Sequence, residues 1–439
     1  MMSVIHDIQI SKTDMNERNE PSGDEIATVV LKQFNELPTK RKPLNRGEGV
    51  REWVPLSGIV ASGENGLTCL ALATGMKCLP QSKLSQAQGN VLHDWHAEIL
   101  CLRTLDHFFL QEILALLSTP SIPSQYLQQR SPETITHDSF QPFELKPHIK
   151  LYMYCSEAPC GDASMELTMA SQDDPTPWDL PPTSTTSPDH KPELPGRANF
   201  QLLGRVRRKP SRPDAPPTLS KSCSDKLATS QYTSVLSSLT SLFISPQNMY
   251  LHSLILPETQ YNETGFVRCF QTRLSNLQKK EQETRQSGYR FHELGIKTTK
   301  KEFVHSRRSE THNAKIEYVS SNISTSWVCG DGKTGGETLV NGALQGRKQF
   351  DVKGASRVCR RRGWKLGLEV LGAITAMQIG GKEIVERIGR GLEVDEYRNL
   401  KESDILRERR RAKEEVRECL GGWVRNEGDD GFRVEISRH

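Results

Sequence analysis

The chain has 439 residues, of which 35% are hydrophobic and 26% charged, and its formal net charge is +4. This length allows two or three ordinary domains, or one large elaborated domain with a substantial buried core. No apolar run reaches the roughly 18 residues of a membrane-spanning helix, and the acid-containing N-terminus lacks the apolar segment of a secretory signal. The 10 cysteines have no regular spacing, which excludes a secreted disulfide framework. We therefore expect an intracellular protein, in the nucleus, the cytoplasm or both.

Alternation and spacing of apolar residues predict several elements along the chain. In chain order these are a helix over 24–35, a β-hairpin formed by 51–60 and 66–73, a long buried helix over 96–117, a strand over 148–156, and a short helix over 163–171. The order of strand, turn and helix, together with surface insertions, predicts an α/β or α+β core decorated by loops.

Three polar tracts interrupt this pattern, at roughly 118–144, 171–196 and 274–315, and the second is rich in proline. Such compositions cannot build a core, so we expect disordered surface insertions. The mixed charges of residues 407–418 are typical of the solvated face of a helix.

Two short motifs suggest chemistry, namely His96-Ala97-Glu98 and Pro159-Cys160-Gly161. Imidazole and thiolate are good zinc ligands, and zinc nucleobase deaminases carry H-x-E followed by P-C-x-x-C, with the glutamate as acid and base. Ala163 stands where the second cysteine of that signature belongs. Each motif alone is common, and the alternative is a structural histidine and a small buried cysteine.

A catalytic zinc ion needs a third protein ligand besides a histidine and one cysteine. The spacing of the remaining cysteines does not identify it. The candidates include Cys101, Cys155, Cys223, Cys269, Cys329 and Cys359.

Further motifs add a resemblance. Together with the first two, the segment 222–226 (SCSDK) resembles the deaminase domain shared by adenosine deaminases acting on RNA and eukaryotic tRNA-specific adenosine deaminases. In that family a long insertion separates the second cysteine from the first. Further matches are 74–77 (TGMK), 93–96 (HDWH), 204–209 (GRVRRK), 327–331 (WVCGD) and 422–424 (GWV).

The resemblance implies an α/β (α+β) fold: a single elaborated cytidine-deaminase-like domain over 51–435, after an N-terminal helix and lead-in over 1–50. Its central mixed sheet would carry a zinc site at the N-termini of two helices. The implied metal ligands are His96, Cys160 and Cys223, and the implied proton shuttle is Glu98. The implied reaction is the zinc-dependent hydrolytic deamination of adenosine to inosine.

Two segments are strongly basic: 205–226 holds seven basic and two acidic residues, and 347–365 holds eight and one. Such a balance is typical of contacts to RNA phosphates. Family members also enclose inositol hexakisphosphate, and a buried polyanion requires many cations. The positions that match its ligands are Lys77, Arg103, Lys226, Lys401 and Arg411, with Tyr397 and Trp423 nearby. Asp94 and Lys209 match a polar relay from zinc to polyphosphate, whereas Leu102 and Thr229 replace arginines found in relatives.

The length of chain before the deaminase-like region indicates which RNA is the substrate. Only about 50 residues precede the first matching strand, which leaves no room for a double-stranded RNA-binding domain. The chain therefore resembles the tRNA enzyme, which acts on adenosine 37, immediately 3′ of the anticodon of alanine tRNA. We expect tRNA as partner, and neither DNA nor membrane. The alternatives are editing of double-stranded RNA or mRNA, deamination of cytidine or free nucleosides, and a catalytically silent RNA-binding subunit.

Overall fold

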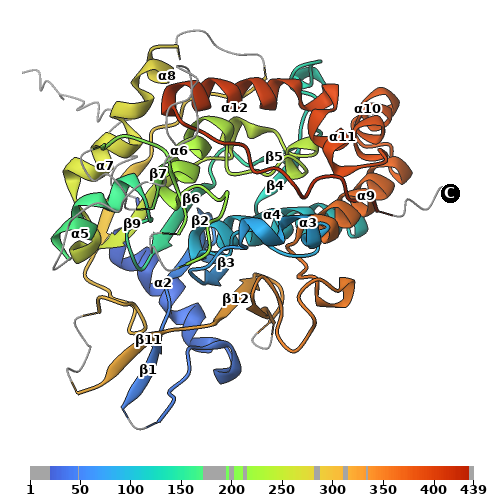
Figure 1. Cartoon of the computed structure of the whole chain (residues 1–439). Coiled ribbons are helices and arrows are strands. Elements are labelled where there is room, and N and C mark those ends of the chain that lie inside the picture. Colours follow the sequence, from blue (N-terminus) through green and yellow to red (C-terminus); the bar gives the residue numbers. More distant parts are fainter. Residues whose placement is uncertain are drawn as a thin grey trace, which may run out of the picture.

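A computed structural model describes residues 20–47, 49–171, 194–196, 202–210, 215–280, 287–309, 315–332 and 335–434. Over these residues the chain has a mixed α/β fold built on one mixed sheet (Figure 1). The strands of this sheet, in spatial order, are β10 (Gly295–Thr299), β9 (Leu251–Pro257), β6 (Lys150–Cys155), β2 (Leu56–Gly63), β3 (Gly66–Thr74), β12 (Ile323–Val328), β13 (Glu337–Val340) and β14 (Ala343–Leu344). The pairs β10–β9 and β9–β6 are parallel, and the other neighbours are antiparallel.

Three small strand pairs lie outside this sheet. Two are parallel, β1 (Val50–Trp53) with β11 (Glu317–Ser320) and β7 (Leu194–Pro195) with β8 (Arg207–Arg208), and one is antiparallel, β4 (Leu127–Gln129) with β5 (Phe143–Leu145).

Helices are distributed along the whole described chain. They are α2 (Gly23–Glu36), α3 (Leu84–Ala87), α4 (Ala97–Ser118), α5 (Met165–Ala170), α6 (Cys223–Thr233), α7 (Glu263–Phe270), α8 (Ser275–Lys280), α9 (Arg360–Ala376), α10 (Lys382–Leu392), α11 (Tyr397–Glu402) and α12 (Arg407–Leu420). None of the described helices combines the length and the apolar character needed to cross a bilayer.

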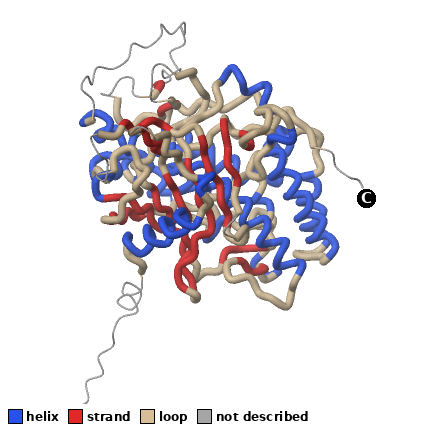
Figure 2. Tube along the Cα trace, turned by 90° about the horizontal axis from the view of Figure 1, so that it is seen from below, coloured by secondary structure: helices blue, strands red, loops and turns tan. Residues whose placement is uncertain are grey.

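Helices cover both faces of the main sheet (Figure 2). Because side chains alternate along a strand, neighbouring residues belong to different cores: Val60 packs with α2, whereas Ile59 and Ala61 pack with α4. A capping box between Ser22 and Glu25 fixes the start of α2. The sheet is therefore buried on both sides, as its continuous apolar strands require.

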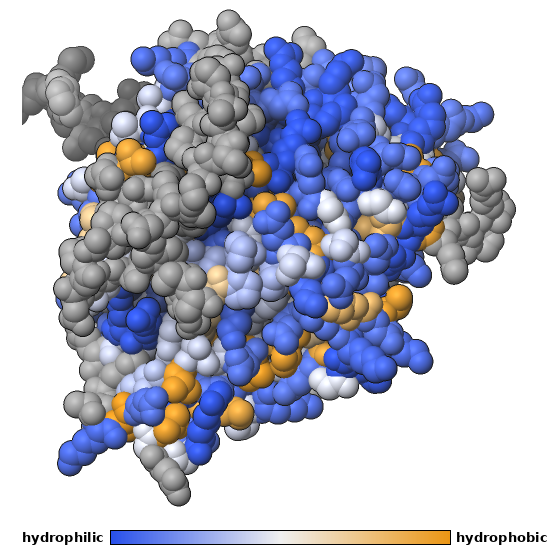
Figure 3. Space-filling model, viewed as in Figure 1, coloured by the Kyte–Doolittle hydropathy of each residue, from blue (hydrophilic) through white to orange (hydrophobic). Residues whose placement is uncertain are grey.

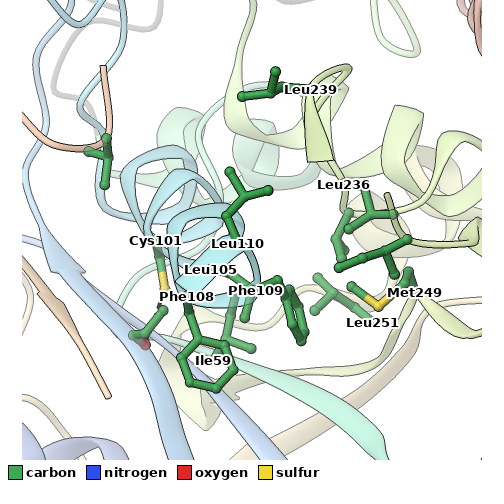
Figure 4. Close-up of a cluster of buried hydrophobic side chains, with 14 of the residues drawn as sticks. Ile59, Cys101, Leu105, Phe108, Phe109, Leu110, Leu236, Leu239, Met249 and Leu251 are labelled. Carbon is green, nitrogen blue, oxygen red and sulfur yellow. Dashed lines mark hydrogen bonds between the residues drawn. The ribbon is translucent and has the colours of Figure 1, made fainter. Parts of the chain in front are cut away.

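The helix α4 is the centre of the larger core. Figure 4 shows its side chains Cys101, Leu105 and Phe109 between the sheet, represented by Ile59 and Leu251, and the segment that carries Leu236, Leu239 and Met249. Apolar residues surround most of this helix because it packs against strands on one side and other helices on the other. This burial fixes the N-terminus of α4 relative to the sheet.

The predictions of the first helix, the hairpin, the long buried helix, the strand over 148–156 and the short helix after it are confirmed by α2, β2–β3, α4, β6 and α5. The mixed α/β class is confirmed as well. The polar tract over 118–144 contains β4 and buries Phe140 and Phe143. Most of the proline-rich tract, residues 172–193, lies outside the described residues.

The prediction of a merely solvated helix face over 407–418 is wrong. The corresponding helix α12 buries Arg409, Ala412 and Val416 and packs against α6. The Arg409 guanidinium donates to the carbonyl oxygens of Thr233 and Leu236. Basic residues of this helix therefore point inward as well as toward solvent.

Candidate metal centre

His96 lies at the N-cap of α4. Its backbone N–H donates to Asp94 Oδ1 at 3.0 Å, and the next residue, Ala97, donates to the Gly75 carbonyl at 2.9 Å. Gly75 has φ +146, and a Cβ there would overlap the Trp95 carbonyl oxygen. The T-G-M-K segment therefore needs its glycine to come this close to the residues that precede α4.

Cys160 and Cys223 lie on two loops that touch each other. Cys160 follows β6 and precedes the short 3₁₀ helix η4 (Asp162–Ser164), and Cys223 is the first residue of α6. The backbone N–H of Cys223 lies 3.4 Å from Cys160 Sγ, and Ser224 donates to the Cys160 carbonyl at 3.0 Å. Gly161 has φ +110, and a Cβ there would overlap the side chain of Ser222. A glycine is required where the two loops meet.

These loops and the start of α4 bring three ligand atoms together. One atom each from His96, Cys160 and Cys223 lies within 4.8 Å of the other two, and Cys160 Sγ is 3.9 Å from His96 Nδ1. A second such group consists of Cys78, Asp94 and His96. Of the candidate third cysteines, the structure thus brings Cys223 to the pair that the motifs predicted.

Charges at this centre are strongly coupled. The pKa of Cys160 lies well below its usual range, chiefly because the Cys223 thiol donates a hydrogen bond to it, with further help from Lys209 and His96. Burial raises the pKa of Cys223. Burial and Lys209 disfavour the charged form of His96, but the nearby Cys160 outweighs them and the pKa of His96 rises to about 10. The site thus favours a thiolate, which is the form that binds metal.

Glu98 is the second residue of α4 and is buried, with 6% of its surface exposed. Burial and the neighbouring Cys160 raise the pKa of its carboxyl group. Burial raises the pKa values of Cys155 and Cys223, and the charge of Glu98 raises them further. The Glu98 carboxyl group therefore lies close to His96, Cys160 and Cys223. Asp94 and Glu98 are equally close in sequence to His96, but Lys209 and Lys226 hold the Asp94 carboxylate, so Glu98 is the acidic group placed to carry a proton.

The residues predicted to form a relay lie together beside the cluster. Lys209 Nζ donates to Asp94 Oδ2 at 2.8 Å and lies 3.2 Å from Cys223 Sγ. Lys226 and Ser220 also donate to Asp94 Oδ2. Burial disfavours the Asp94 carboxylate, but the two lysines prevail and hold its pKa well below its usual range. A continuous polar chain therefore leads away from Cys223.

This chain leads toward a group of cations, which we name the basic cluster. Its members are Arg103, Arg360, Lys401, Arg409, Lys413 and Arg417. Each of them interacts electrostatically with at least one other member of the cluster. Burial, and then Arg409, Arg417 and Lys401, hold the pKa of Lys413 well below its usual range. The buried Nε atoms of Arg103 and Arg417 have no hydrogen-bond partner among the described residues. Arg417 also stacks over the Trp423 ring, 5.7 Å from its centroid.

Three of the predicted polyphosphate ligands have other partners in the structure. Lys77 donates to Asn322, and Lys226 belongs to the polar chain on Asp94. The Arg411 side chain is 64% exposed and lies 3.5 Å from Glu415. Arg103 and Lys401 lie in the basic cluster, where Lys401 also pairs with Asp430 at 3.3 Å.

Sequence reasoning missed Arg409, Lys413 and Arg417, although a signal for them exists. They recur every fourth residue along α12 and so form a stripe on one side of the helix. Arg411 lies half a turn away from that stripe and faces solvent. The helical phase of the basic residues, rather than their number, would have separated the two sets.

Comparison with known proteins agrees with this arrangement. Residues 71–427 match the adenosine-deaminase (editase) domain. The chain is 37% identical to tRNA-specific adenosine deaminase 1 of Schizosaccharomyces pombe over 349 residues, which are 79% of this chain and 84% of that protein. With tRNA-specific adenosine deaminase 1 of Saccharomyces cerevisiae it shares 37% identity over 58% of this chain and 64% of the relative. With the double-stranded RNA-specific editase Adar of Drosophila melanogaster it shares 28% identity over 54% of this chain and 34% of the relative.

A mixed α/β fold with a histidine–cysteine group that could hold a metal, beside a buried glutamate, has the features of the nucleobase-deaminase class. The chain belongs to the adenosine-deaminase (editase) domain family. The predicted resemblance is thereby confirmed.

Proposed function

We propose that this protein converts adenosine to inosine in tRNA by hydrolytic deamination. The observation that carries the proposal is the convergence of His96, Cys160 and Cys223 within 4.8 Å, with the buried carboxyl group of Glu98 beside them. The names of the yeast relatives support tRNA as the substrate class. Among tRNAs, we propose alanine tRNA and the adenosine immediately 3′ of its anticodon.

The donor set fits zinc. One imidazole nitrogen and two thiolates suit a tetrahedral zinc ion and leave the fourth position for water. Zinc bound there would lower the pKa of its water, so that a nucleophile is available near neutral pH. We further propose that residues 51–435 form a single cytidine-deaminase-like domain, with the metal ligands at the N-termini of α4 and α6. In support, His96 caps α4 and Cys223 begins α6.

The chain's own residues would then perform the proton transfers. Glu98 accepts the proton of the attacking water and delivers it to the ring nitrogen of adenine while the water oxygen bonds to C6. It then takes the remaining proton from the new hydroxyl group on C6 and passes it to the amino group, which leaves as ammonia while the C6=O bond of inosine forms. Lys209 holds the Cys223 sulfur by its hydrogen bond, and Asp94 fixes both Lys209 and the backbone of His96. The target base lies in a loop and is already unpaired, so its extrusion costs little.

We also propose that the basic cluster holds a polyphosphate, inositol hexakisphosphate in particular. What supports it is the group of cations around the half-buried Lys413 and the buried Nε atoms of Arg103 and Arg417, which have no partner among the described residues. Cations at this density in a partly buried cluster favour a compensating anion beyond Asp429 and Asp430, because uncompensated buried charge is destabilising. Phosphate analysis of the denatured, purified protein tests this, and a phosphate-free active enzyme would contradict it.

The function is tested with purified protein and unmodified alanine tRNA. We expect sequencing to show guanosine in place of adenosine next to the anticodon. Formation of uridine from cytidine without inosine would favour the nucleoside-deaminase alternative. Stoichiometric zinc without deamination of any RNA would favour the silent-subunit alternative, against which the presence of Glu98 argues.

A further inference from the structure

The β1–β11 pair and its flanking loops form a basic ribbon, defined here as residues 38–47, 49–53, 300–309 and 315–320. It holds ten Lys or Arg residues and three acidic ones. In Figure 1 the two strands project from the lower edge of the molecule, away from α10 and α11. Figure 3 shows that hydrophilic residues cover most of the face in this view, with hydrophobic residues in small scattered groups. The ribbon is rich in cations but also exposes the apolar side chains of Leu44 (51%) and Val304 (55%).

Short backbone contacts connect the ribbon to the start of α4. The Trp53 carbonyl accepts from Ser321, whose neighbour Asn322 accepts from Lys77. Two residues after Trp53, the Pro55 carbonyl accepts from Gly75, and the Gly75 carbonyl accepts from Ala97. Trp53 thus lies only a few backbone contacts from His96.

A second connection leads to the cysteine loop. The backbone N–H of Arg307 donates to Glu157 Oε1 at 2.7 Å, and Glu157 is three residues before Cys160. The ribbon therefore touches the segments that carry two of the three candidate ligands. This places the ribbon beside the segments that carry His96 and Cys160.

On the ribbon, Trp53 and Arg307 form a cation–π pair. The guanidinium carbon of Arg307 lies 5.5 Å from the centroid of the Trp53 ring. Trp53 is partly exposed and Arg307 is exposed. No carboxylate of the described residues forms an ion pair with the Arg307 side chain, so its charge remains available to a ligand. Arg51, next to Glu52 on β1, is also exposed.

An aromatic ring with an adjacent guanidinium is the chemistry that binds single-stranded RNA. Bases stack on the ring and on the guanidinium plane, and the surrounding cations attract phosphates. A purely structural role does not explain the pair, because the fold uses the backbone N–H of Arg307 and leaves its charged group at the surface.

We propose that the basic ribbon binds the RNA segment that flanks the target adenosine, with Trp53 and Arg307 stacking on an unpaired base. This inference rests on the proposed function and adds to it a substrate-binding surface outside the metal centre. Shape-based recognition of a folded RNA needs such contacts, because the target base alone carries little information.

The experiment uses the full chain and an unmodified tRNA transcript, with Kd from filter binding and KM and kcat from initial rates. Trp53→Ala should weaken binding about tenfold, whereas Trp53→Phe, which keeps a stacking ring, should stay within about threefold of wild type. Arg307→Glu should weaken binding about tenfold or more and reduce the dependence of Kd on salt by about one phosphate contact. The loss should fall on Kd and KM, with zinc content equal to that of the wild type.

Arg390→Glu is the matched control. Arg390 is an exposed arginine on α10, on the part of the molecule farthest from the ribbon in Figure 1. Its reversal should leave the Kd for tRNA within about twofold of wild type. If Trp53→Ala does not fold, Arg307→Glu at the surface decides the question by itself.

The two proposals fail separately. Absence of inosine with the wild-type protein overturns the proposed function. Inosine formation with the same Kd and KM for wild type and both ribbon variants overturns the ribbon as a binding surface, as does an equal loss in Arg390→Glu.

Discussion

Arg273 Nη1 lies 2.8 Å from Oδ1 of Asp225, which is two residues after Cys223, and both side chains are almost fully buried. Arg268, five residues earlier, pairs in the same way with Asp162, which is two residues after Cys160. Each cysteine is therefore followed by a buried aspartate that an arginine of one short segment holds. This segment clamps the two cysteine loops together.

Loss of this clamp should destabilise the fold and the metal site together. We expect Arg273→Ala to lower the free energy of unfolding by about 3–5 kcal/mol, because it leaves the Asp225 carboxylate buried and without its cation. Chelator competition should also show weaker zinc binding. Urea unfolding measures the first effect.

An exposed ion pair provides the control for the clamp. Arg398 pairs with Asp430 at 3.3 Å, but its side chain is 53% exposed. Arg398→Ala should cost less than about 1 kcal/mol, because solvent already screens the pair. Equal costs for Arg273→Ala and Arg398→Ala would contradict the clamp.

Gly161→Ala should abolish zinc binding by separating the loops. Its added Cβ would overlap the Ser222 side chain next to Cys223, and φ +110 is unfavourable for alanine. Gly66→Ala is the control that separates the steric overlap from the backbone strain. Gly66 also has a positive φ of +88, but nothing lies within 4 Å of its Cβ position. The control should cost only backbone strain of about 1–2 kcal/mol and keep zinc. Retention of stoichiometric zinc by Gly161→Ala would show that the loops can move apart without losing the site.

Acid should destabilise the protein partly through Glu20. A hydrogen bond from Lys150 is the main cause that lowers its pKa from 4.5 to about 2, and Lys297 and His252 add to it. Because the folded-state pKa is depressed, the contribution is fully present above the unfolded-state pKa and is lost as pH falls from about 4.5 toward 2. The side chain is 29% exposed, so we expect only about 1 kcal/mol. Glu20→Gln should remove this part of the pH dependence in urea unfolding measured between these two pH values.

The sequence predicts those parts of the site that are local. His96 and Glu98 lie within one turn at the start of a strongly apolar helix, and Cys160 follows a clear strand, so spacing alone places them near element ends. Cys223 is separated from Cys160 by a long insertion, and only the S-C-S-D-K resemblance distinguishes it from the eight other cysteines. Proximity of residues so far apart in the chain is a product of the fold rather than of local pattern.

The clamp and the basic cluster could not be predicted, for the same reason. Arg273 meets Asp225 across 48 positions of sequence, and nothing in the composition near either residue indicates the pair. In the cluster, charge counts along 407–418 predict a cationic helix but not which cations face inward. Helical phase decides this, and Lys413 and Arg411 differ in it by half a turn.

Glu98→Gln should keep zinc and lose turnover. Glutamine has the same shape but cannot carry a proton, and positioned proton transfer contributes about 10²–10⁴-fold to rates of this kind. We expect kcat to fall by at least that factor in the inosine assay, with zinc content near that of the wild type. Wild-type kcat in this variant would remove Glu98 from the mechanism.

Lys413→Met tests whether the basic cluster holds an anion, because the direction of the change in the unfolding midpoint depends on whether an anion is bound. Burial among Arg409, Arg417 and Lys401 disfavours the charged lysine unless an anion compensates it. With a bound polyphosphate, the substitution removes an attractive contact and should lower the unfolding midpoint and the phosphate content. If no anion is bound, replacing this half-buried like charge with an apolar chain of similar length should raise the midpoint instead. Arg411→Ala, at the exposed position of the same helix, should change neither quantity, and thermal unfolding with phosphate analysis of all three proteins distinguishes these outcomes.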